Sequence, residues 1–140
     1  AWLDARGLGV PELVLENGSG LSRRERISAE GLGRLLQAAW RSAVMPELMS
    51  SLPITGVDGT MRRSRATAGR AHLKTGSLRD VAGVAGYVLG NSGKRYVLVA
   101  VINHPNANAA KPALDALVQW TIDDSGRMRR PAEPSRRNAQ

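Results

Sequence analysis

The architecture of this protein follows from residues 70–103, which read RAHLKTGSLRDVAGVAGYVLGNSGKRYVLVAVIN. Two parts of this segment, Val81–Gly90 and Arg95–Asn103, are rich in β-branched residues and are bounded by turn formers, which predicts two strands. Only four residues, Asn91–Lys94, separate them. So short a linker can join only antiparallel neighbours, and the segment is therefore predicted to form a β-hairpin.

A third strand is predicted just before this hairpin. From Arg70, small residues alternate with His72 and Lys74, and this pattern indicates a strand that ends near Gly76. The two hairpin strands are nearly all apolar, which indicates that both faces of the sheet are covered. The expected fold class is α/β, or an α+β layer, with three antiparallel strands covered by helices.

Helices are expected on both sides of these strands in the sequence. Ser28 is a candidate N-cap, with Glu30 in the first turn that follows it. Helical spacing predicts a helix over residues 28–44, whose apolar stripe is interpreted as core: Leu32, Leu35, Leu36, Ala39, Trp40, Ala43 and Val44. Pro46 either ends that helix or starts another. A last helix is predicted over Ala107–Ile122.

Composition excludes several classes of protein. A chain of 140 residues with 42% apolar content is long enough for one globular domain with its own core. No run of 18 apolar residues occurs, which excludes a transmembrane helix. The chain has no cysteine, which excludes disulfides, thiolate metal sites and a cysteine nucleophile. The two histidines have no further ligand at metal-binding spacing, so neither a metal nor a cofactor is expected.

The net charge of +8 raises the possibility of a nucleic-acid partner. Residues 126–140 contain five arginines and one glutamate, so half of this charge lies on a short terminal segment. Because that segment has few apolar residues, we expect a basic disordered tail after a folded domain of residues 1–125. The segment has no aromatic residue on which bases could stack, and no nucleic-acid partner is expected.

Two functions without catalysis remain alternatives at this point. The first is a basic module that binds nucleic acid or another anionic polymer through its arginines. The second is an interaction partner whose exposed sheet edge accepts a strand from another chain.

The residues Lys74-Thr75-Gly76-Ser77 form the strongest local motif. At a strand edge, the lysine supplies positive potential, the threonine hydroxyl can donate to a substrate carboxylate, and the glycine allows a ligand to approach closely. The backbone N–H of Ser77 can then point at a substrate carbonyl as half of an oxyanion hole. A Lys-Thr-Gly strand followed by a hairpin and a helix is the setting in which this motif serves serine acyl-transfer enzymes.

Three ordered motifs resemble one enzyme family over roughly the first 120 residues. Leu15–Arg23 (LENGSGLSR) is similar to a D/ENGSGLSR segment and Leu52–Thr60 (LPITGVDGT) to an LPxxGxDGT loop. Lys74–Leu78 (KTGSL), followed by Val81–Tyr87 (VAGVAGY), resembles a KTG strand and the sequence after it. The family is the class C low-molecular-mass penicillin-binding proteins, the D-alanyl-D-alanine carboxypeptidase/endopeptidases of the penicillin-binding protein 4 type.

The resemblance implies a fold, a function and a site. The fold is the C-terminal part of the β-lactamase/transpeptidase-like fold. The function is hydrolysis of peptidoglycan peptides that end in D-Ala-D-Ala through a serine acyl-enzyme, with β-lactam antibiotics as further ligands. Lys74 is the implied catalytic residue, and Thr75, Gly76 and Ser77 are the implied substrate-binding residues. The implied location is the periplasm, with or without association with the membrane.

The chain departs from this family in one respect. The catalytic serine of the family lies in a Ser-x-x-Lys motif, and a Ser-x-Asn motif completes the site. None of the three lysines here has a serine three residues before it, and no asparagine has a serine two residues before it. We therefore expect a C-terminal fragment that is inactive alone and whose partner is the missing N-terminal part of the same protein.

Overall fold

The structure is a computed structural model, and it describes residues 2–124. Its centre is one antiparallel sheet in the order β1 (Ala71–Leu78), β2 (Val81–Leu89) and β3 (Arg95–Asn103). The predicted three-stranded sheet is confirmed. The first strand continues two residues beyond Gly76, because Leu78 still pairs with Val81 across the tight β1–β2 turn.

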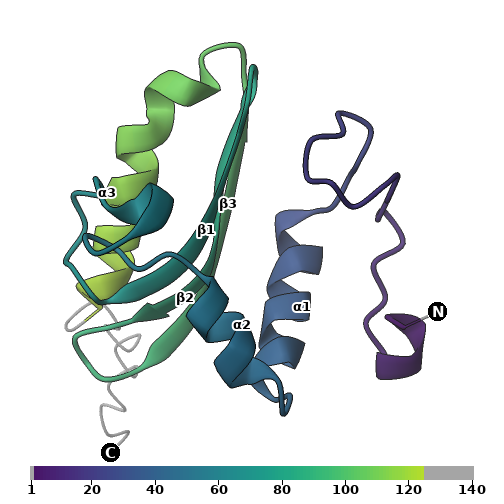
Figure 1. Ribbon diagram of the computed structural model, residues 1–140, viewed down its shortest axis with the longest axis horizontal. Coiled ribbons are helices and arrows are strands. Elements are labelled where there is room, and N and C mark those ends of the chain that lie inside the picture. Colours follow the sequence, from purple (N-terminus) through teal and green to yellow (C-terminus); the bar gives the residue numbers. More distant parts are fainter. Residues whose placement is uncertain (1, 125–140) are drawn as a thin grey trace, which may run out of the picture.

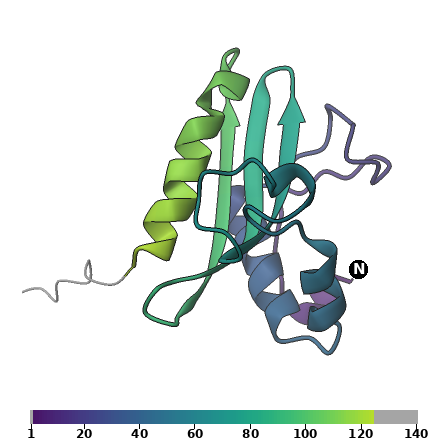
Figure 2. The same cartoon turned by 60° about the vertical axis from the view of Figure 1, so that its left-hand side comes forward.

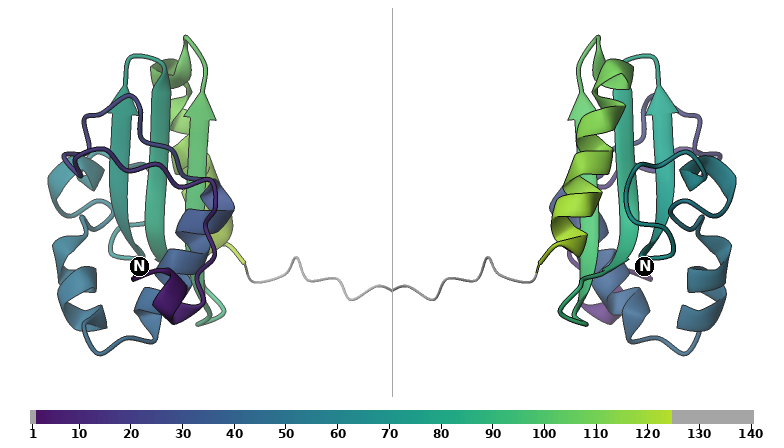
Figure 3. Two further views of the ribbon diagram at one scale, coloured as in Figure 1. Left: turned by 90° about the vertical axis from the view of Figure 1, so that its right-hand side faces the viewer. Right: turned by 90° about the vertical axis from the view of Figure 1, so that its left-hand side faces the viewer.

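Helices cover both faces of this sheet, which confirms the α/β class (Figure 1). Helix α1 (Ala29–Trp40) lies on one face and α3 (Lys111–Ile122) on the other. Ser28 caps α1 as predicted, since its hydroxyl accepts the N–H of Gly31 at 2.9 Å. The two views of Figure 3 show these opposite faces separately.

The predicted end of the first long helix at residue 44 is wrong, because α1 ends at Trp40. After Trp40 the hydrogen bonds join residues three apart, as in a turn: the N–H of Ser42 donates to the carbonyl of Ala39, and the N–H of Met45 donates to the carbonyl of Ser42. Pro46 lies in the first turn of α2 (Met45–Ser51), where its missing N–H costs no helical hydrogen bond. Pro46 therefore starts a second helix.

The hydrophobic core lies between the sheet and α3. Leu73, Val84 and Val88 of the sheet are buried against Val118 and Ile122 of the helix. These strand residues share one face, because side chains alternate along each strand and Leu73 pairs with Gly86, which lies midway between Val84 and Val88 on β2.

The face toward α1 is less completely covered, and the interpretation of the whole α1 stripe as core is wrong. Trp40, the last residue of α1, is 41% exposed, and Val44, which belongs to the predicted stripe but lies beyond the end of the helix, is 63% exposed. Tyr87 anchors the helix instead: its hydroxyl donates to the carbonyl of Leu36 at 2.6 Å, and its ring lies 5.3 Å from that of Trp40. The apolar periodicity correctly identified the face of α1 that contacts the sheet. How deeply each side chain on that face is buried depends on the other segments that pack around it.

The segment before α3 also differs from prediction. Residues Ala107–Ala110 form a 3₁₀ turn, and the α-helix begins only at Lys111. No helix in residues 2–124 is long and apolar enough to span a membrane. The predicted basic tail, residues 126–140, lies outside the described residues.

Candidate functional site

Strand β1 is an edge strand, and the second half of its outer edge is open. The segment before the strand covers the first half, where the N–H of Leu73 donates to the carbonyl of Pro53 at 2.8 Å. Backbone groups two residues apart in a strand point to the same side, so those of Thr75 and Ser77 also point away from β2. No strand within residues 2–124 pairs with that half. The N–H of Ser77 is thus placed where an extended ligand could accept from it.

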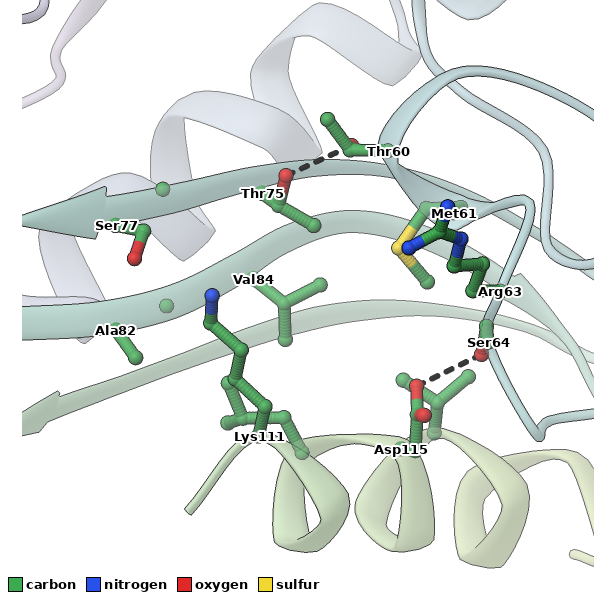
Figure 4. Close-up of a pocket in the computed structure, with 14 residues that line it drawn as sticks. Thr60, Met61, Arg63, Ser64, Thr75, Ser77, Ala82, Val84, Lys111 and Asp115 are labelled. Carbon is green, nitrogen blue, oxygen red and sulfur yellow. Dashed lines mark hydrogen bonds between the residues drawn. The ribbon is translucent and has the colours of Figure 1, made fainter. Parts of the chain in front are cut away.

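The side chains of Thr75 and Ser77 point to the α3 side and line a cavity of about 370 Å³ (Figure 4). The cavity lies between the sheet, α3 and the loop that precedes β1, and Figure 2 shows this loop beside α3. Part of its lining is apolar: Met61, Ala82, Val84, Leu114 and Val118. The remaining side chains are polar or charged: Thr60, Arg63, Ser64, Lys111 and Asp115.

Hydrogen bonds fix the orientation of both strand side chains. The hydroxyl of Thr75 lies 2.7 Å from that of Thr60. The hydroxyl of Ser77 donates to the side-chain oxygen of Asn108, whose amide in turn donates to the carbonyl of Leu78 at 2.8 Å. The site is therefore held by residues from two other segments of the chain.

Thr60 was not predicted as a site residue, although the LPITGVDGT motif contains it. A hydrogen bond within the motif holds the loop in a turn: the N–H of Ile54 donates to the carboxylate of Asp58 at 2.7 Å. Gly56 has a φ of 67°, and a Cβ there would lie 2.8 Å from the Cβ of Ala68. These local constraints shape the loop that presents Thr60 to Thr75, and the motif itself was the signal.

Lys74 lies on β1 as predicted, but its side chain leaves the strand on the opposite face from Thr75 and Ser77. Its ammonium returns to the strand edge and donates to the carbonyl of Thr75 at 2.6 Å. The structure therefore gathers Thr75, Gly76 and Ser77 around the cavity, whereas Lys74 does not line it. Its positive charge lies at the open edge.

Two cations that were not predicted as site residues also line the cavity. Arg63 comes from the loop before β1 and Lys111 from the start of α3. Within residues 2–124, neither forms an ion pair with an acidic side chain. Asp115 is the acidic residue of the lining, and it accepts from the hydroxyl of Ser64 at 2.7 Å and from the N–H of Arg65 at 3.2 Å. The cavity can thus attract an anionic group.

Known proteins with similar sequences share one activity in their names. The chain is 35% identical over 131 residues to the D-alanyl-D-alanine carboxypeptidase of Actinomadura sp. (strain R39). This alignment covers 86% of this chain and 24% of that protein. It is 30% identical over 112 residues to the D-alanyl-D-alanine carboxypeptidase DacB of Haemophilus influenzae, or 72% of this chain and 22% of that protein. The chain thus spans about a quarter of the length of these relatives.

Two solved structures are also similar to this chain. The crystal structure of penicillin binding protein 4 (dacB) from Haemophilus influenzae superposes with a TM-score of 0.69 and 25% identity, over 84% of this chain and 30% of that one. The same protein complexed with a novel β-lactam gives a TM-score of 0.70 and 27% identity, over 86% of this chain and 29% of that one. Residues 1–123 match the D-Ala-D-Ala carboxypeptidase 3 (S13) family, and the chain belongs to it.

Proposed function

We propose that this chain is the C-terminal part of a serine-type D-alanyl-D-alanine carboxypeptidase/endopeptidase, a class C penicillin-binding protein that hydrolyses peptidoglycan stem peptides and is acylated by β-lactams. Membership of the carboxypeptidase family supports this proposal. The observation that carries it is the juxtaposition of the Thr75 hydroxyl and the outward N–H of Ser77 beside a cavity lined by cations.

In this proposal the substrate peptide lies along the open half of β1, as an added strand would. The N–H of Ser77 donates to the carbonyl oxygen of the scissile bond and stabilises the negative charge that develops on it. The hydroxyl of Thr75 donates to the carboxylate of the residue that leaves. Lys74 adds positive potential at the edge, and Gly76 leaves room for the peptide between these two contacts.

The chemical step needs a nucleophile that this chain does not contain in the required motif. We propose that a serine of a Ser-x-x-Lys motif in an N-terminal part of the same protein attacks the carbonyl carbon. The serine oxygen forms a C–O bond as the C–N bond breaks, and the serine proton passes through the lysine of the motif to the leaving amine. Water then attacks the ester carbon, returns a proton to the serine and releases the shortened peptide as a carboxylic acid. The proposal includes a periplasmic location, free or associated with the membrane.

The test is intact-protein mass spectrometry after incubation with a penicillin. The isolated chain is expected to show no added mass, because acylation requires an activated serine. The longer protein is expected to gain one penicillin on the serine of its Ser-x-x-Lys motif and to release D-alanine from a D-Ala-D-Ala peptide. A stoichiometric adduct on a serine of this chain, or a longer protein that is not acylated, would contradict the proposal.

A further inference from the structure

We propose that Lys111 and Arg63 bind the free carboxylate of the residue that leaves, and that they restrict the site to peptides in which this carboxylate is present. The inference rests on the proposed function and names two specificity residues for it. Both residues lie outside the KTG strand and outside the three motifs on which the resemblance depends.

Lys111 and Arg63 approach the cavity from different walls. Lys111 begins α3, and its ammonium points from the helix toward the strands, near Ser77 and Val84 (Figure 4). Arg63 belongs to the loop before β1, and its guanidinium lies beside Met61 in the same view. Because both line the cavity that Thr75 lines, an anion held by Thr75 would be within the field of two positive charges.

Lys111 and Arg63 can bind a ligand carboxylate because the carboxylate of Asp115, which also lines the cavity, is hydrogen-bonded to other residues. Asp115 follows Lys111 by one helical turn, but its two oxygens accept from Ser64 and from the backbone of Arg65. This contact holds Asp115 toward the loop. A substrate carboxylate would supply the negative partner that Lys111 and Arg63 lack within residues 2–124.

The apolar part of the cavity indicates how large the leaving residue can be. Ala82, Val84 and Leu114 line a volume of about 370 Å³, much more than the methyl group of an alanine occupies. A leaving residue with a longer aliphatic side chain, as in a peptide cross-link, can also be accommodated. The shared requirement is then a carboxylate on the carbon that bears the leaving nitrogen, whether the bond is terminal or part of a cross-link.

Peptide binding to the ¹⁵N-labelled chain, followed by NMR, tests this inference without any catalytic step. The probes are diacetyl-L-Lys-D-Ala-D-Ala and the same peptide with a C-terminal carboxamide. The variants are Lys111→Met and Arg63→Gln, with Lys94→Met and Arg62→Gln as controls, because neither control residue lines the cavity. Lys111→Gln provides a second variant in case the methionine perturbs the spectrum as a whole.

We expect the unchanged chain to bind the acid about tenfold more tightly than the amide, since an ionised acceptor forms the stronger hydrogen bonds. Each cavity variant should reduce this preference about two- to fivefold, the range for exposed ion pairs, and salt of about 0.5 M should reduce it further. The two control variants should retain the full preference.

A full preference for the acid in both cavity variants would overturn the inference and leave the proposed function standing, because the carboxylate would then be bound by other groups. Equal binding of acid and amide by the unchanged chain would also overturn it. If neither peptide shifted the resonances of β1, both the inference and the proposed peptide position would fail. The penicillin adduct on the longer protein tests the proposed function independently of these outcomes.

Discussion

The hydroxyl groups of Thr75 and Thr60 lie 2.7 Å apart and join the KTG strand to the LPITGVDGT loop. A threonine hydroxyl has one proton to donate and rotates to suit its partners. In the structure Thr75 donates to Thr60. Because hydroxyl protons rotate, this bond can reverse when a ligand binds, so that Thr75 donates to the ligand carboxylate and accepts from Thr60. In the proposed site, the loop motif therefore has the role of orienting the donor.

Thr75→Val tests the donor itself. Valine has nearly the shape of threonine but cannot donate, and a hydrogen bond to a charged group contributes about 1.5 to 3 kcal/mol. We expect acylation of the longer protein by a penicillin to slow by about 10- to 1,000-fold, with the upper part of the range reached if the bond strengthens in the transition state. Stopped-flow or quenched acylation kinetics measure the effect, and an unchanged rate would remove Thr75 from the site.

Thr60→Val tests the orientation of that donor. Thr60 acts through Thr75, so acylation should slow less, by about two- to tenfold. The double variant should be no slower than Thr75→Val alone, because Thr60 then has nothing to orient. Additive losses in this double-mutant cycle would show that Thr60 acts on the substrate directly.

Gly76→Ala separates folding from ligand approach. Apart from the two neighbouring residues, a Cβ at this position would meet no atom of residues 2–124 within 4 Å, so the thermal midpoint should stay within about 2 °C of the original. If Gly76 is needed for the peptide to approach the strand, acylation of the longer protein should fall about tenfold or more. Unchanged acylation would mean that glycine is not required for ligand access.

Gly86→Ala is the control for Gly76→Ala, because it places the same methyl group where the structure has no room for it. A Cβ at Gly86, where φ is 153°, would lie 2.1 Å from the backbone carbonyl oxygen of His72 on the neighbouring strand. The strands must move apart to accept it. We expect the free energy of unfolding to fall by about 3 kcal/mol or more, which a urea titration would measure.

Asp124→Asn tests a contact that ties the end of α3 to the β2–β3 turn. Asp124 accepts from the N–H of Ser92 at 2.9 Å, from the hydroxyl of Ser92, and from the hydroxyl of Tyr96 at 2.6 Å. The bonds from Ser92, and then that from Tyr96, hold the pKa of the Asp124 carboxyl below its ordinary value of 3.8. Ionised Asp124 therefore stabilises the fold above that value, and the stabilisation is lost as the pH falls through the lower folded-state pKa.

We accordingly expect Asp124→Asn to lower the thermal midpoint by a few degrees at pH 7, and to lower it by progressively less as the pH is brought below 3.8 toward the lower folded-state pKa. Differential scanning calorimetry at pH 7 and at a series of pH values below 3.8 measures this. Glu47→Gln, which removes an exposed carboxylate of α2, is the matched control and should leave the midpoint unchanged across this range. A loss for Asp124→Asn that stays the same across the range would contradict the role of the charge.

The order of the elements and part of the site could be predicted from the sequence, because both depend on residues close together in the chain. The β-branched runs and the four-residue linker specified the hairpin, and Ser28 specified the start of α1. Alternation along one strand also placed Thr75 and Ser77 on a common face. The same alternation sends the side chain of Lys74 to the opposite face of the strand.

Tertiary structure alone decided which distant side chains complete the site. Thr60 reaches Thr75 from a separate loop, and Lys111 and Arg63 line the same cavity because the start of α3 lies across it from that loop. Tertiary structure also decided that Trp40 remains 41% exposed, although its position on the apolar stripe of α1 predicted burial. Local periodicity gives the face that an element presents, whereas contacts between elements depend on the packing of the whole chain, which residue spacing does not encode.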